Sequence, residues 1–285
     1  MNHTASLKAI RSDGQVFYYQ SDAWELRKLE GFDFSEIETS KQARGVGDGD
    51  IITGQRRLSR VMKITVRPLD IANYDLQRNQ AIAFHNSRMK FDLQIEYLGT
   101  KRIALDCQIT ASNFPLGNVH RLKDLTIEFL SPYADLFAIG SEQTNFSIKK
   151  AMWAWPHVYR TGNPLNFASN ELTTEKIINY IGSSPASPLI TIESTGYAKN
   201  ITVTVNKRTA VLNLEMKKGD RIEIDTAKSY AVHNNKILAL TADNDPYDFR
   251  KFLLDFGDNL VKVDAEVGGS ALRTEIEYVG RYDGL

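Results

Sequence analysis

The chain is poor in cysteine and has no long apolar runs. Its single cysteine among 285 residues, Cys107, excludes an internal disulfide framework, and its place in an alternating apolar pattern favours a small buried hydrophobe over a reactive thiol. No run approaches the roughly 20 apolar residues of a membrane-spanning helix, so no membrane anchor is expected. The start, Met1–Ser6, does not resemble a signal peptide, so we expect synthesis in a reducing cytoplasm without general export.

The chain also lacks an excess of charge of either sign. Lys and Arg together number 35, as do Asp and Glu, which argues against generic binding of nucleic acid and suggests self-association. The charge is uneven, because residues 51–102 sum to +6 and residues 243–285 to −5. Two interpretations remain open: solvated faces, or complementary contacts between copies or with partner proteins.

Recognisable catalytic or ligand-binding sets are missing. No two of the five histidines have a metal-ligand spacing, and the glycine-rich stretch 45–50 lacks the lysine and the helix of a phosphate loop. Asp243, Asn244 and Asp245 lack the remaining features of a calcium loop. Glu275 and Glu277 share one strand face and leave a glycoside hydrolase as a weaker alternative. We therefore expect no cofactor, no metal and no enzymatic activity.

Strict alternation of apolar and polar residues is abundant, and it predicts a mainly β protein of half-buried antiparallel strands. Clear cases in the first half are residues 62–66, 91–97, 103–109 and 125–129, where Ile103, Leu105, Cys107 and Ile109 are expected on one face. Residues 69–87 predict one helix, with Leu69, Ala72, Leu76 and Ala83 near one face. After Pro188, short alternating strands and frequent turns predict a β-sandwich.

Residues 31–60 break the alternation and read as a long, functional loop. Its glycines and acids, which include a possible hairpin tip at residues 48–50, are a candidate interface: Gly45, Gly47, Asp48, Gly49 and Asp50.

The strongest basic cluster lies at the end of this stretch and in the strand after it. No aromatic residues are interleaved with these cations, as they are along a nucleic-acid binding track. A protein interface or the polar wall of a channel therefore suits it better. Its members are Arg56, Arg57, Arg60, Lys63 and Arg67.

An ordered set of short motifs runs through the chain. Gly47–Asp50 precedes the strand entry 57–67, the helix, and the strand end Leu125–Phe129 with Ser131-Pro132-Tyr133. The second half continues with further motifs: Ile178–Gly182, Pro188–Ile192, Lys199–Val203, Gly219–Thr226 and Gly257-Asp258-Asn259. This succession resembles the distal tail proteins of long-tailed bacteriophages (siphophages), although Phe256-Gly257-Asp258 stands where the family often has Pro-Gly before the late Asn.

The resemblance implies that residues 1–135 form a ring-forming domain similar to the tail-tube protein. This domain would be a split β-barrel or sheet with one helix and the loop 31–60. It implies residues 136–285 as a linker region plus a galectin-like antiparallel β-sandwich. The family forms a hexameric ring, the structural hub of the tail tip or baseplate. That hub joins the tail-tube protein to the tail-associated lysin or tail-fibre protein and to receptor-binding or baseplate proteins. It surrounds the end of the tape-measure protein, and DNA passes through its channel. The implied location is the virion tail tip, with assembly in the host cytoplasm.

A carbohydrate-binding module that helps attach the particle to the host cell wall is the alternative function. Trp153 and Trp155 are its candidate residues, but both precede the predicted sandwich core. His233–Lys236 reads as a hairpin turn rather than a sugar-binding strand, so no sugar-binding residues follow from the resemblance.

Overall fold

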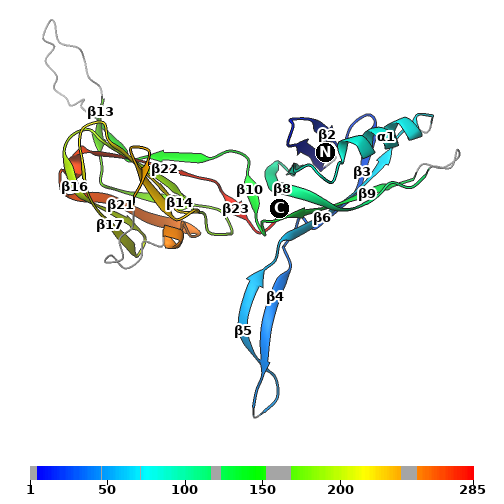
Figure 1. Cartoon of the computed structure of the whole chain (residues 1–285), viewed down its shortest axis with the longest axis horizontal. Helices are drawn as coiled ribbons and strands as arrows, with labels where there is room; N and C mark the ends of the chain where they lie inside the picture. Colours follow the sequence, from blue (N-terminus) through cyan, green and yellow to red (C-terminus); the bar gives the residue numbers. More distant parts are fainter. Residues whose placement is uncertain (1–4, 46, 71, 117–122, 152–167, 239–248) are drawn as a thin grey trace, which may run out of the picture. The chain divides into compact units, whose positions relative to one another are not determined.

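The computed structural model divides the chain into two compact units (Figure 1). Unit 1 consists of Met1–Ile139 with Arg281–Leu285, and unit 2 of Gly140–Gly280. The structure describes residues 5–45, 47–70, 72–116, 123–151, 168–238 and 249–285. Trp153, Trp155 and the group Asp243–Asp245, which carried two sequence hypotheses, lie outside the described residues.

Unit 1 is built on one antiparallel sheet with the strand order β2-β1-β7-β8-β9-β6-β3. In this order β2 and β3 are the end strands, so the described strands form an open sheet and not a closed barrel. The short strands β10 and β23 pair with each other, and β10 also pairs with β8. The bounds are β1 (Ser6–Arg11), β2 (Val16–Tyr18), β3 (Trp24–Glu30), β6 (Arg60–Pro68), β7 (Phe91–Tyr97), β8 (Thr100–Asn113), β9 (Leu125–Ser131), β10 (Leu136–Ala138) and β23 (Arg281–Tyr282).

The alternation of the central strands defines the core of unit 1, as predicted. Met62, Ile64 and Val66 on β6 are fully buried, and Ile64 lies opposite the equally buried Ile127 on β9. Between β7 and β8, Leu98 and Gly99 have φ of 51° and 80°, which makes a two-residue hairpin turn.

The prediction that Ile103, Leu105, Cys107 and Ile109 share one buried face of β8 is wrong, because the strand contains a bulge. The pairing with β7 shifts register between Phe91 and Leu93, which lie opposite Cys107 and Ala104. Asp106, within the bulge, has a left-handed φ of 54°, and its N–H is bound by the Asp92 carboxylate at 3.0 Å. Ala104 and Cys107 are therefore buried, whereas Ile103 and Leu105 are only partly covered.

The helix α1 (Tyr74–Phe84) is shorter than predicted and buries a different face. The Asp70 carboxylate accepts the N–H groups of Ala72 and Asn73, which forms a turn before the helix starts. The buried face consists of Tyr74, Gln77, Ala81 and Phe84, which follow helical spacing. The predicted face Leu69, Ala72, Leu76 and Ala83 is exposed.

The predicted long loop is a β-hairpin that extends away from the sheet of unit 1 (Figure 1). Its strands β4 (Ile37–Ala43) and β5 (Asp50–Arg57) pair with each other alone among the described strands. The ladder ends at the pair of Ala43 and Asp50, so the predicted tip is confirmed. Polar residues and glycine suggested a loop, but a ladder of two strands requires only backbone hydrogen bonds.

Unit 2 packs two antiparallel sheets around one core, as the predicted sandwich requires. The sheet orders are β11-β22-β15-β18-β19-β20 and β14-β21-β16-β17, with a separate ladder of β12 and β13. The inward residues of both sheets, such as Ile190, Ile224, Val203 and Val261, belong to one buried cluster. The bounds are β11 (Glu142–Asn145), β12 (Ser147–Ala151), β13 (Ala168–Leu172), β14 (Glu175–Tyr180), β15 (Leu189–Ser194), β16 (Ala198–Val205), β17 (Arg208–Met216), β18 (Arg221–Asp225), β19 (Tyr230–His233), β20 (Lys236–Ile237), β21 (Gly257–Val267) and β22 (Leu272–Tyr278), with short 3₁₀ turns η1 (Phe249–Lys251) and η2 (Gly269–Ala271).

Asn234 and Asn235 have left-handed φ values of 48° and 65° between β19 and β20, so the predicted hairpin turn is confirmed.

The residues Arg281–Leu285, which the sequence placed with the sandwich domain, belong to unit 1, because β23 pairs with β10. A partner strand so far away in the sequence leaves no local signal.

Candidate functional site

The five residues of the predicted basic cluster do not form one patch. Arg56 and Arg57 end the hairpin strand β5, while Arg60, Lys63 and Arg67 lie along β6. Lys63 and Arg67 point to the outward face of the sheet, and Arg60 points inward at the base of the hairpin. Arg56 lies on the hairpin and pairs with Glu38 at 2.5 Å.

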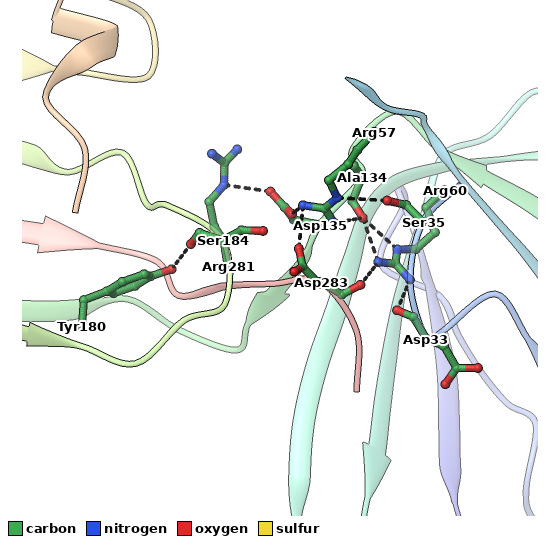
Figure 2. Close-up of polar contacts among 10 residues, drawn as sticks. All are labelled: Asp33, Ser35, Arg57, Arg60, Ala134, Asp135, Tyr180, Ser184, Arg281 and Asp283. Carbon is green, nitrogen blue, oxygen red and sulfur yellow. Dashed lines mark hydrogen bonds and ion pairs between the residues drawn. The ribbon is translucent and has the colours of Figure 1, made fainter. Parts of the chain in front are cut away.

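Arg60 is the most unusual of the five because it is a cation with 1% exposure. Its Nη1 donates to the carbonyl oxygens of Gly31 and Asp33 at 2.9 Å each, and its Nε and Nη2 donate to that of Ala134 at 3.1 and 2.8 Å. Nη2 also donates to the carbonyl oxygen of Asp283. All five N–H groups of the guanidinium therefore bind backbone carbonyls. Figure 2 draws those of Asp33, Ala134 and Asp283. Burial lowers the pKa of Arg60 from its usual value, and the nearby Arg57 lowers it further.

Arg57 supplies the ionic part of the same arrangement. Its Nη1 pairs with Asp135 at 2.5 Å and with Asp283 at 2.7 Å, and its Nε donates to the Ser35 hydroxyl at 3.1 Å (Figure 2). Its Nη2 donates to the carbonyl of Ala134 at 3.2 Å. We call these two arginines and the six residues that they bind the root cluster: Gly31, Asp33, Ser35, Arg57, Arg60, Ala134, Asp135 and Asp283.

The end of the chain is fixed beside the root cluster. The Arg102 guanidinium lies 3.4 Å from the centre of the Tyr282 ring, and the Leu285 N–H donates to the Phe32 carbonyl at 3.2 Å. A Cβ on Gly284 would collide with the backbone of Asp33, so glycine permits this close approach. The base of the hairpin is thus tied to the segment that leaves unit 1 and to the segment that returns to it.

The comparisons with known proteins agree with this architecture. Residues 181–282 match the family model of the siphovirus-type tail component, C-terminal domain. This region is similar to the C-terminal domain of siphovirus-type tail components. The fold of the chain is similar to that of the Dit protein of phage SPP1, with a TM-score of 0.67, 13% identity, and coverage of 96% of this chain and 98% of that one. The resemblance to siphophage distal tail proteins is therefore confirmed.

Other similar structures are more distant. The baseplate of phage p2 in its activated conformation contains a chain that matches with TM-scores of 0.44 with Ca and 0.45 with Sr, each at 10% identity and with coverage of 96% of this chain and 98% of that one. The SPP1 protein is described as a paradigm of the hub adsorption apparatus of phages that infect Gram-positive bacteria. No curated protein matched the chain.

The outward side of the strands β3, β6 and β9 is polar from Lys63 to Arg67, whereas Val61, two positions earlier on the same face of β6, is 49% exposed. Lys63 stands in register between Glu30 and Glu128. Arg67 binds Asp124 at 2.6 Å, an ion pair that raises the pKa of the guanidinium. We call these side chains and the threonines between them the polar face: Lys28, Glu30, Lys63, Thr65, Arg67, Asp124, Thr126 and Glu128. Cations and anions alternate on it, so it carries no concentrated positive field.

The residues that the sequence offered as candidates for catalysis lie in environments typical of structural residues. Burial raises the pKa of the Cys107 thiol to about 12, which agrees with its interpretation as a buried hydrophobe. Glu275 and Glu277 lie half-buried on the outward face of β22. Within the described residues, no cluster of three potential metal ligands and no helix long and apolar enough for a membrane span was found.

The sequence contained signals for only part of the root cluster. Arg57 and Arg60 were recognisable as basic residues. The four groups that bind Arg60, however, are backbone carbonyls, which every residue carries. In the sequence, Asp135 lies 78 residues from Arg57, and Asp283 lies 223 residues from Arg60. Composition and local sequence pattern carry no signal that pairs such distant positions.

Loss of the Asp283 charge is expected to loosen the end of the chain. Asp283→Asn removes the ion pair with Arg57 but keeps the carbonyl that binds Arg60. Because both side chains are about 30% exposed, the effect should be less than about 1 kcal/mol, or roughly threefold faster amide exchange in β10 and residues 281–285. Glu96→Gln, which breaks the exposed pair with Lys101, is the control and should leave these amides unchanged. Equal exchange in both variants would contradict the assignment.

Proposed function

We propose that the protein is a structural hub of a siphophage tail tip that forms a hexameric ring. The ring joins the tail tube to the tail-fibre and receptor-binding apparatus, and DNA passes through its channel. The observation that carries this proposal is the similarity to the SPP1 Dit fold over 96% of the chain, because it includes both units and not only the matched domain. The role is structural rather than catalytic.

The β4–β5 hairpin is the proposed contact between neighbouring copies. Ile37, Ile51 and Ile52 are 59%, 50% and 60% exposed on it. Apolar side chains on an isolated hairpin gain stability only when another surface covers them. A contact between the hairpin of one copy and a different surface of the next is heterologous, and such contacts close into rings. The tip residues Gly45, Gly47, Asp48, Gly49 and Asp50 belong to the same proposed interface.

The polar face is the proposed wall of the channel. A wall along which DNA moves must not retain phosphates, since each close cation adds affinity. Lys63 and Arg67 meet this requirement, because carboxylates stand opposite or beside them. Arg56 is likewise neutralised by Glu38, on the hairpin.

The remaining partners follow from the same proposal. They are the tail-tube and tape-measure proteins, the tail-associated lysin or tail-fibre protein, and receptor-binding or baseplate proteins. The proposed location is the virion tail tip, after synthesis and assembly in the host cytoplasm.

The ring is tested on the purified full-length protein. Light scattering coupled to size-exclusion chromatography should give six times the protomer mass, alone or together with its tail partners, and negative-stain images should show a hexagonal annulus. A particle that remains monomeric at high concentration, with and without these partners, would refute the ring.

The hairpin contact has its own test. Ile51→Asp with Ile52→Asp should abolish the ring and leave the melting temperature of the protomer nearly unchanged, because both side chains are exposed in the protomer. Ile237→Asp is the matched control, since Ile237 is 76% exposed in unit 2. Rings that persist in the hairpin variant would place the contact elsewhere.

A further inference from the structure

A depression of about 830 Å³ opens on the sandwich of unit 2, at one end of its second sheet. Three segments line it: the turn between β16 and β17, the 3₁₀ turn η1, and the segment that leads into β21. The motif Gly257-Asp258-Asn259 contributes two residues to its lining, and no part of the proposed hub function uses the depression. Among the described residues, its charged lining consists of Lys207, Arg208, Arg250, Lys251, Asp255 and Asp258.

The floor of the depression is held by two asparagines. Asn259 is 1% exposed; its Nδ2 donates to the carbonyls of Asp255 and Gly257 at 2.7 and 2.9 Å, and its Oδ1 accepts the Asp255 N–H at 2.8 Å. Asn206 Nδ2 donates to the same Oδ1 at 2.9 Å. The turn that carries Lys207 is thereby fixed to the segment that carries Asp255, so the site is formed before any ligand arrives.

The cations come from two of the three segments. Lys207 and Arg208 are exposed and make no ion pair with any residue that the structure describes. Arg250 and Lys251 add two more positive charges from η1. Arginine presents a planar fork of donors that fits phosphate oxygens, and lysine adds a point charge, so this set suits a phosphate group.

The same depression also offers acceptors. Asp255 and Asp258 are exposed, and Asp258 Oδ1 accepts from Asn179 Nδ2 at 2.8 Å, which orients the carboxylate. Carboxylates beside cations repel an acidic peptide but accept hydrogen bonds from hydroxyl groups. A nucleic acid strand would gain most from stacking on aromatic rings, and none of the described residues that line the depression is aromatic.

We propose that this depression binds a phosphate ester of a polyol or sugar, with the phosphate on the cations and the hydroxyl groups on Asp255 and Asp258. A free ester and one unit of a polymer present the same chemistry, and the experiment below distinguishes these two sources. This site is independent of ring formation, because every described residue of its lining belongs to unit 2 of one protomer.

Titration calorimetry on the full-length protein tests the proposal with four probes: glycerol 3-phosphate, inorganic phosphate, glycerol, and a poly(glycerol phosphate) oligomer. Glycerol 3-phosphate should bind at least about threefold more tightly than inorganic phosphate, and glycerol should not bind measurably. The oligomer should bind more tightly than the monomer if a polymer is the natural source, and equally per unit if the free ester is. Phosphate binding as tightly as the ester would overturn the role of the carboxylates.

Lys207→Gln with Arg208→Gln should lower the affinity at least about tenfold. The control is Lys217→Gln with Lys218→Gln, which removes the same charge from another exposed turn of the sandwich and should change the affinity less than about twofold. Asp255→Asn should reduce the preference for the ester over inorganic phosphate while phosphate binding is kept. Equal losses in the two lysine-containing variants, or tighter binding of a poly-Glu peptide or of single-stranded DNA, would overturn the proposal. Failure here leaves the ring unaffected, and a failed ring leaves this binding measurable.

Discussion

Replacing Arg60 by methionine should destabilise unit 1 by about 4 kcal/mol, the largest effect that we expect from any single substitution in this chain. The guanidinium saturates the carbonyls of Gly31, Asp33, Ala134 and Asp283, and methionine leaves these groups without a donor. Urea unfolding followed by Trp24 fluorescence reports on unit 1, because Trp24 is 6% exposed there. The measurement is made with Trp153→Phe and Trp155→Phe in the background.

Two further variants separate the causes of this effect. Arg56→Met removes an arginine from the same segment, but its pair with Glu38 is largely exposed, so the loss should stay below about 1 kcal/mol. Arg60→Lys keeps the charge but places all donors on one nitrogen, which cannot reach the carbonyls of three chain segments, so most of the loss should remain. Full stability of Arg60→Lys would show that charge alone, and not the fork of donors, holds the cluster.

The strand positions were predictable because burial on one side of a strand leaves an alternating pattern in the sequence. Met62, Ile64 and Val66 illustrate this, and the glycine or asparagine turns at Leu98-Gly99 and Asn234-Asn235 marked two hairpins. The alternating pattern fails to predict which side chains are buried where a β-bulge adds a residue to a strand. Asp106 adds one residue to β8 and moves Ile103 and Leu105 away from the buried face, and no residue type in that stretch signals a bulge.

The candidate site was predictable only as a group of residue types. Counting cations found Arg57, Arg60 and Lys63 together, but the structure separates an inward cation that binds carbonyls from outward cations that face carboxylates. The strand period decides this difference, since Arg60 and Lys63 are three positions apart and point to opposite faces. Backbone acceptors and the C-terminal Asp283 could not be found from the sequence, because their proximity to Arg60 is a product of the whole fold.

The second large effect that we expect is a loss of stability in mild acid through His85. The imidazole is 6% exposed at the end of α1; its Nε2 accepts from the Tyr19 hydroxyl at 2.8 Å, and its Nδ1 donates to the Ala81 carbonyl at 2.7 Å. This pattern uses the neutral ring, and burial lowers the pKa of His85 from 6.5 to about 4. The unfolded chain binds a proton at His85 below pH 6.5, whereas the folded chain binds it only near pH 4.

Stability is therefore unaffected by His85 above pH 6.5, falls as the pH drops from 6.5, and reaches its full loss of about 3 kcal/mol near pH 4. Urea midpoints of unit 1 at pH 7, 6, 5 and 4 measure this slope. His85→Gln removes the titrating group and should flatten the curve between pH 6.5 and 4, at the cost of lower stability at pH 7. His233→Gln, on the partly exposed histidine of unit 2, should keep the slope of unit 1. If His85→Gln retains the full pH dependence, then groups other than this buried ring set the acid sensitivity of the aromatic core around Phe17, Tyr19 and Phe84.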